Sequence, residues 1–198
     1  MGSTIVLATA NPGKVKELSE PLGALGYQIV TQSQWEIQPI AETGQTFIEN
    51  ALLKARHCAQ QSGLPALADD SGLVVEALQG APGIYSARYA GEHASEADNR
   101  HKLLEQLQQV PAAQRTAHFY CVIVYLRYAD DPAPLISQAH WQGAIALHPS
   151  GDQGFGYDSL FYLPDRHCTA AALSREQKFQ HSHRGQALRQ LLTVLPHA

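Results

Sequence analysis

The sequence has few of the features that mark membrane, secreted or disulfide-rich proteins. Its longest uninterrupted apolar run, Phe119–Leu126, has eight residues, whereas a membrane-spanning helix needs about 20. Its three cysteines, Cys58, Cys121 and Cys168, are odd in number and widely spaced. They fit neither a disulfide framework nor a zinc site with short cysteine spacing. We therefore expect a cytoplasmic protein with reduced thiols and no membrane partner.

An excess of positive charge is also missing. The chain has 14 basic and 18 acidic side chains, for a formal net charge of −4. This balance gives no overall field to attract nucleic acid, which is therefore not an expected partner. Hydrophobic residues make up 44% and charged residues 16% of the 198 positions, as in folded globular proteins. The length favours about one domain, so residues 1–198 are interpreted as a single domain.

Strand and helix patterns alternate along the first half of the chain. A β-prone run at 4–8 precedes apolar residues at helical spacing that end at Leu25. Thr46-Phe47-Ile48-Glu49 is a capping box that predicts a second helix. The runs 116–128 and 135–141 predict two strands joined as a β-hairpin. Together these patterns favour an α/β fold with a mixed sheet.

The loop between the first strand and the first helix is a candidate phosphate site. Backbone N–H groups at a helix N-terminus and a nearby lysine both favour a bound phosphate. The loop is not a Walker A motif, because Val15 follows the lysine. An ordinary turn that uses Asn, Pro and Gly for backbone reasons is the alternative. The loop consists of Thr9, Ala10, Asn11, Pro12, Gly13 and Lys14.

Two adjacent carboxylates, Asp69 and Asp70, follow the short apolar run Leu67–Ala68. Unpaired buried charge is costly, so both side chains cannot be core residues. We expect the strand to end there in a polar turn, Asp69–Gly72. Carboxylates at that position could hold Mg²⁺ and activate a water molecule. The alternative is an Asx-type turn that caps the next element.

Isolated charged residues could add to such a site. Glu42 is a further carboxylate candidate. Lys54 lies in the second predicted helix, where it could form a surface ion pair or contact a phosphate. Lys178, His183 and Arg184 cluster near the C-terminus. Taken alone, they indicate a solvated basic face.

The segment Phe155-Gly156-Tyr157-Asp158 combines two aromatic rings, an open backbone position and a carboxylate. These groups suit stacking on a nucleobase and accepting its ring N–H hydrogens. The alternative is a tight turn before a strand, with both aromatic side chains in the core.

Six ordered motifs resemble those of the non-standard purine nucleoside triphosphate pyrophosphatases (the inosine triphosphatase family), and the chain looks like a bacterial member. The resemblance covers nearly the whole chain. The motifs are T-A-N-P-G-K (9–14), E-T-G-Q-T-F-I-E-N-A (42–51), A-D-D-S-G-L (68–73), G-A-P-G-I-Y-S-A-R-Y-A-G (80–91), G-F-G-Y-D (154–158) and S-H-R-G-Q-A-L (182–188).

The resemblance implies hydrolysis of ITP, dITP and XTP to the monophosphate and pyrophosphate, with Mg²⁺ as cofactor, by a homodimer. It also implies a mixed central sheet flanked by helices, in two lobes with the active site in the cleft between them. Asp70 matches the family's proton acceptor and metal ligand. Many relatives carry an acidic residue at the position of Ala41, so Glu42 or a water molecule would complete the metal site here.

The resemblance also assigns the residues that would contact substrate. The triphosphate would lie on the first loop, and the nucleoside and remaining phosphate contacts would come from the later motifs. These residues are Thr9, Ala10, Asn11, Pro12, Gly13, Lys14, Lys54, Ser71, Phe155, Gly156, Tyr157, Asp158, Lys178, His183 and Arg184.

Selectivity is expected at purine position 6, where a donor near His183 and Arg184 would suit a 6-oxo group and reject adenine. Two other functions stay open at this point. A non-catalytic nucleotide-binding or RNA-binding module would explain the aromatic residues and the loop, but not the adjacent carboxylates. A hydrolase for other nucleotides would use the same scaffold on a different substrate.

Overall fold

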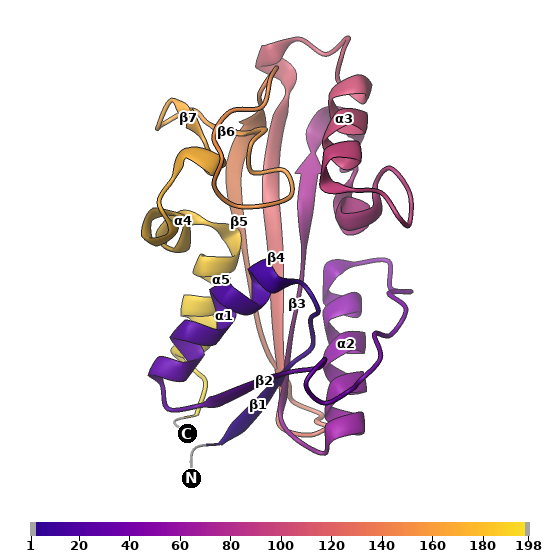
Figure 1. Ribbon diagram of the computed structural model, residues 1–198, viewed down its shortest axis with the longest axis vertical. Helices are drawn as coiled ribbons and strands as arrows, with labels where there is room; N and C mark the ends of the chain where they lie inside the picture. The colour runs from indigo at the N-terminus through magenta and orange to yellow at the C-terminus, as the bar shows by residue number, and fades with distance from the viewer. Residues whose placement is uncertain (1–2, 197–198) are drawn as a thin grey trace. The chain divides into compact units, whose positions relative to one another are not determined.

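The computed structural model describes residues 3–196 (Figure 1). In this part of the chain seven strands form one sheet in the order β2-β1-β3-β4-β5-β6-β7. They are β1 (Thr4–Leu7), β2 (Gln28–Thr31), β3 (Ala66–Val75), β4 (Thr116–Leu126), β5 (Leu135–Ile145), β6 (Phe161–Leu163) and β7 (Cys168–Thr169).

The sheet is mixed, as the sequence predicts. β1 is parallel to both β2 and β3, and β6 is antiparallel to β5 and β7. β4 and β5, the two strands expected to form a hairpin, are neighbours in the sheet. The α-helices are α1 (Pro12–Ala24), α2 (Phe47–Ser62), α3 (Glu96–Gln106), α4 (Arg175–His181) and α5 (His183–Leu192).

The chain divides into two compact units. The first comprises Met1–Asp70, Cys121–Ala139 and Arg184–Ala198, and the second comprises Ser71–Tyr120 and His140–His183. The chain passes from one unit to the other within β3, β4 and β5 and between two consecutive residues, His183 and Arg184. The single domain expected from the sequence stays a prediction.

The first unit has helices on both sides of its strands. Figure 1 shows α1 and α5 together on one side and α2 on the other. The central strand β1 is buried along nearly its whole length because it receives side chains from both sides. The fully or almost fully buried residues of this unit include Ile5, Leu7, Leu18, Leu22, Ala51, Ala55, Leu67, Val122, Leu188 and Leu191.

The second unit has a core of its own, rich in aromatic rings. The Phe161 ring lies 4.5 Å from that of Phe119 and 5.3 Å from that of Trp141, centroid to centroid. Leu103 and Leu107 add the apolar side of α3 to this cluster. Figure 1 shows α3 on one side of the long strands and α4 on the other.

The helix ends follow the signals in the sequence. Thr46 and Glu49 form the predicted capping box at the start of α2, and Gly63 ends that helix in the left-handed conformation. Capping boxes also begin α3, at Ser95, and α4, at Ser174. Each box satisfies backbone N–H groups that have no partner within the helix.

The predictions for the acidic pair are wrong. Asp69 and Asp70 are both buried, although unpaired charge was expected to keep them from both being core residues. β3 does not end at Ala68 but continues through the acidic pair to Val75, so Asp69–Gly72 is strand and not turn. The strand continues because the carboxylate of Asp69 is neutralised by two cations, described below, and because apolar residues follow at Leu73 and Val75.

Gly143 provides a test of how closely the second unit is packed. A Cβ atom at this position of β5 would lie 2.6 Å from Phe161 Cζ and 2.6 Å from the Tyr162 carbonyl oxygen. We expect Gly143→Ala to lower the free energy of unfolding by about 1–3 kcal/mol, measured by urea denaturation.

Gly23 in α1 is the matched control, because no atom lies within 4 Å of a Cβ added there. Gly23→Ala should leave the free energy of unfolding unchanged or raise it by up to about 1 kcal/mol. Equal changes in the free energy of unfolding for Gly143→Ala and Gly23→Ala would show that Gly143 is not closely packed.

Candidate functional site

The first unit contains a buried ion network around Asp69, whose side chain has 0% exposure. Lys14 Nζ from α1 and Arg184 Nε from α5 each lie 3.1 Å from Asp69 Oδ2. Arg184 Nη1 in turn lies 2.6 Å from Glu17 Oε2. Burial by itself raises the pKa of Asp69, but Lys14 and Arg184 outweigh it and hold that pKa well below its usual range.

Cys121 from β4 borders the same network. Its Sγ lies 3.9 Å from Asp69 Oδ2, and the thiol is buried. Burial and the nearby carboxylate raise the pKa of this thiol, so it is a neutral donor to Asp69 and not a reactive thiolate.

Asp70 has a different set of contacts. Its Oδ1 lies 2.8 Å from Lys54 Nζ, which also lies 2.8 Å from Glu42 Oε1. The same ammonium donates to the main-chain oxygen of Asp69 at 2.8 Å. Lys54 is therefore not part of a surface ion pair on its own helix, because it joins α2 to β3 and to the loop that contains Glu42.

The two partners in this pair respond differently to burial. Burial raises the pKa of Asp70 despite the attraction of Lys54. For Lys54, burial lowers the pKa, but the charges of Asp70, Glu42 and Asp69 more than reverse that effect and leave it raised. A carboxylate whose pKa is raised at a charged site is a candidate proton acceptor.

The carboxylates fit a divalent cation. Asp70 Oδ2 is buried and has no hydrogen-bond partner among residues 3–196. Asp70 and Glu42 together offer the hard oxygen ligands that Mg²⁺ prefers. No group of three or more His, Cys, Asp or Glu residues arranged to hold a metal occurs in the described part of the chain.

The predicted phosphate loop forms the start of α1. Asn11 is the N-cap, and its Oδ1 accepts hydrogen bonds from Gly13 N at 2.9 Å and Lys14 N at 3.2 Å. Thr9 Oγ1 accepts from Asn11 N at 3.1 Å. A phosphate would therefore compete with the Asn11 side chain for these helix N–H groups, while the Lys14 ammonium lies beside the buried Asp69.

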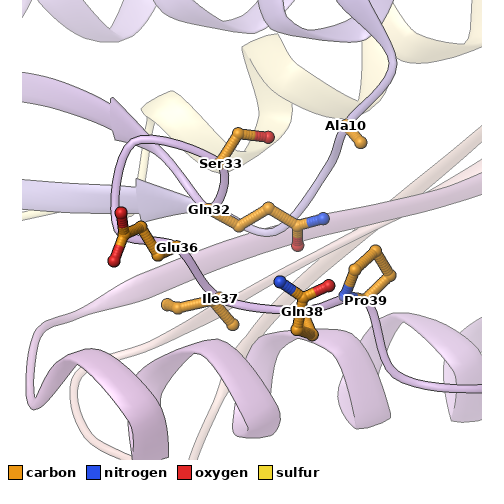
Figure 2. A pocket seen from close by; sticks show the side chains of 7 residues that line it. All are labelled: Ala10, Gln32, Ser33, Glu36, Ile37, Gln38 and Pro39. Atoms are coloured by element: carbon orange, nitrogen blue, oxygen red, sulfur yellow. The ribbon is translucent and has the colours of Figure 1, made fainter.

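A pocket of about 560 Å³ adjoins this loop (Figure 2). Figure 2 shows the amide groups of Gln32 and Gln38 between the loop that carries Ala10 and α2. The seven lining residues include one carboxylate, Glu36, and no cation, so the pocket does not suit a phosphate. They are Ala10, Gln32, Ser33, Glu36, Ile37, Gln38 and Pro39.

In the second unit Phe155–Asp158 forms a tight turn before β6. Asp158 Oδ2 accepts hydrogen bonds from Phe155 N at 2.9 Å and from Lys178 Nζ at 2.6 Å. Lys178 Nζ also lies 4.7 Å from the centroid of the Phe155 ring. Gly154 has φ +79°, and a Cβ atom there would overlap Asp158 Oδ2, so the turn needs a glycine at this position.

The two aromatic residues of the turn differ in environment. Tyr157 is buried in the core of the second unit, and its hydroxyl donates to the Ser86 carbonyl oxygen at 2.9 Å. Phe155 is only half-buried. The interpretation of two core aromatics is therefore correct for Tyr157 and wrong for Phe155.

The basic residues near the C-terminus are not a solvated face. The His183 ring is buried and stacks on Phe119, with centroids 4.7 Å apart and 12° between the planes. Arg184 is buried in the first unit, and the Lys178 side chain is 11% exposed. Ser71, the first residue of the second unit, is half-buried on β3.

Sequence reasoning missed the central position of Asp69 and the contribution of Glu17. Glu17 meets Arg184 across 167 positions of the chain, and no local pattern indicates that contact. For Asp69 a signal was present, because a charged residue directly after a buried strand needs a partner.

Removing the charge of Asp69 should destabilise the protein. Asp69→Asn leaves Lys14 and Arg184 without their shared buried counter-charge, so we expect a loss of about 3–5 kcal/mol in the free energy of unfolding. Urea denaturation measures it. The same change at exposed Asp130 should cost less than about 0.5 kcal/mol. A similarly small loss of unfolding free energy in Asp69→Asn would show that Asp69 does not stabilise the buried Lys14 and Arg184.

No helix among residues 3–196 is long and apolar enough to cross a membrane.

Known proteins similar to this chain cover almost its whole length. The "dITP/XTP pyrophosphatase" of Yersinia pseudotuberculosis serotype I is 58% identical over 96% of this chain and 97% of the relative. That of Vibrio cholerae serotype O1 is 54% identical over 96% of both chains.

Solved structures give the same result. A HAM1 protein from Coxiella burnetii superposes with a TM-score of 0.92 at 49% identity, covering 99% of this chain and 100% of that one. The Staphylococcus aureus Ham1 protein gives 0.85 at 39% identity, covering 97% of each. A Ham1 family model matches residues 5–194. The family that the motifs indicate is therefore confirmed, and the chain belongs to the Ham1 family.

Proposed function

We propose that this protein is a dITP/XTP pyrophosphatase, which hydrolyses dITP, XTP and ITP to the nucleoside monophosphate and pyrophosphate and so removes them from the nucleotide pool. The names of relatives at 54–58% identity support it. The observation that carries it is Asp70, a buried carboxylate held beside Lys54, whose Oδ2 has no hydrogen-bond partner among residues 3–196.

The first unit supplies the charges that a triphosphate needs. A nucleoside triphosphate carries about four negative charges, which cationic side chains and a divalent metal can offset. The ammonium groups of Lys14 and Lys54 lie beside the buried carboxylates of Asp69 and Asp70. Mg²⁺ held by Asp70 and Glu42 would neutralise phosphate charge and polarise the scissile bond.

Asp70 acts as the proton acceptor. A water oxygen forms a bond to the α-phosphorus, and the bond from that phosphorus to the bridging oxygen breaks. The proton of the water passes to Asp70, and pyrophosphate leaves. Lys54 Nζ donates to Asp70 Oδ1 and keeps the carboxylate oriented, while Oδ2 is the oxygen that accepts the proton. General-base catalysis of this kind contributes about 10²–10⁴-fold to a rate.

The second unit supplies the recognition of the base. The half-buried Phe155 ring offers a stacking face, and Lys178 and His183 lie on the same unit. A donor from this group of residues, or from nearby backbone, meets the 6-oxo group of hypoxanthine or xanthine. Adenine would oppose that donor with its own amino group, and an unpaired buried donor gives strong discrimination.

The first test measures products from the wild-type protein. With Mg²⁺ and dITP, XTP, dATP or dGTP offered in parallel, we expect pyrophosphate from dITP and XTP and little from the other two. Chelation of Mg²⁺ should stop turnover. Orthophosphate in place of pyrophosphate would contradict attack on the α-phosphorus. Binding without turnover would favour a nucleotide-binding module.

The second test removes the proton acceptor. Asp70→Asn should lower kcat for dITP by about 10²–10⁴-fold, because the amide cannot accept the proton of the attacking water. Binding of dITP, followed by calorimetry, should persist. Asp130→Asn, on an exposed turn, should keep wild-type turnover. Unchanged turnover in Asp70→Asn would show that Asp70 is only structural.

The homodimer that the resemblance implies and the cytoplasmic location that the cysteine pattern favours stay predictions.

A further inference from the structure

The peptide groups on both sides of Gly156 are held by two side chains of α3. Gly156 N donates a hydrogen bond to Glu96 Oε2 at 2.8 Å, and Arg100 Nη1 donates to the Gly156 carbonyl oxygen at 2.7 Å. Glu96 and Arg100 are also one helical turn apart, with Arg100 Nη1 3.6 Å from Glu96 Oε2. The N–H and C=O groups of Gly156 are thus bound by one acidic and one basic side chain.

Gly156 depends on these contacts more than its neighbours do. Phe155 N is bound by Asp158, and Tyr157 is fixed by its buried ring and by its hydroxyl bond to Ser86. Gly156 has no side chain, adopts φ +61°, and has no atom within 4 Å of a Cβ added to it. Glycine also has the widest range of allowed backbone conformations. Neither side-chain packing nor backbone sterics therefore fixes the orientation of Gly156.

The start of α3 places Glu96 and Arg100 firmly. Ser95 caps the helix, and its capping box with Asp98 satisfies the first backbone N–H groups. Glu96 is the first helical residue, where a negative charge is favoured by the helix dipole. Hydrogen bonds that involve a charged group are also stronger than neutral ones. Glu96 and Arg100 therefore hold Gly156 in one orientation, although glycine is otherwise a flexible residue.

We propose that Glu96 and Arg100 are positioning residues for purine selectivity: they fix the peptide groups on both sides of Gly156 and thereby the face of Phe155 that the base stacks on. The inference rests on the proposed function, because it needs the Phe155–Asp158 turn to bind the base. Both side chains belong to the second unit, whereas the residues proposed for the chemical step belong to the first, so the pair acts on recognition and not on the chemical step.

Two truncations test the inference. Glu96→Ala and Arg100→Met each remove one hydrogen bond to Gly156. We expect KM for dITP to rise about three- to tenfold in each variant, as for the loss of one charge-assisted bond, with kcat within about twofold of wild type. The preference for dITP over dGTP, as the ratio of kcat/KM values, should fall. In the double variant, KM for dITP should rise by less than the product of the two single increases, since both residues hold Gly156.

Three controls separate positioning from general damage. Glu105→Ala removes the same charge from an exposed position of the same helix and should leave KM and selectivity unchanged. Glu96→Gln keeps an oxygen that can accept from Gly156 N, so it should restore most of the selectivity. Thermal unfolding of every variant reports on the fold.

The outcomes are distinct. Unchanged KM and selectivity in Glu96→Ala and Arg100→Met would overturn the inference, as would equal rises in KM for dITP and dGTP. A fall in kcat together with a lower Tm would also overturn it, because the pair would then serve only the fold. If the wild-type protein does not hydrolyse dITP at all, the proposed function fails, and this result is distinguishable from all of these.

Discussion

The neutralisation of one buried carboxylate is the constraint on which the first unit depends. Asp69 lies in the interior of β3, where an unpaired charge would be very costly. Lys14 and Arg184 remove that cost, and Glu17 offsets part of the positive charge they bring. Because these residues come from β3, α1 and α5, pairing the carboxylate also fixes how the two helices pack on the sheet. The ammonium of Lys14, which is proposed to bind phosphate, is thereby held in place before substrate binds.

Adjacent positions on a strand give the two aspartates different tasks. Successive side chains of a β-strand point to opposite faces, so Asp69 and Asp70 meet different partners although they are neighbours in sequence. Two strong cations keep Asp69 ionised, whereas burial beside the shared Lys54 raises the pKa of Asp70. Environments that move the pKa values of two carboxyl groups apart are typical of sites where one group is structural and the other takes part in proton transfer.

Sequence patterns correctly predicted the features that depend on interactions between residues close together in the chain. The capping box at Thr46 and the first strand were predicted correctly, since each depends on residues a few positions apart. The strand through Asp69 was predicted as a turn, because its continuation depends on Arg184, which lies 115 positions later. The same reason explains the wrong interpretation of Arg184 as a solvated residue. The assignment of Asp70 came from the family motif, while its contacts with Lys54 and Glu42 needed the fold.

The two units use different physical means for the two parts of the proposed reaction. The first gathers charge, with Lys14, Lys54 and the aspartates in buried pairs, as expected where phosphate charge must be stabilised. The second holds a glycine-containing turn by directed hydrogen bonds and one aromatic anchor. Distinguishing purines that differ by one exocyclic group depends on the position of a few donors and acceptors, and an error of about 1 Å in such a position loses much of the effect. A turn rich in glycine can make close contact with a base only if something else holds it still. The contacts from α3 meet that need without adding net charge to the turn.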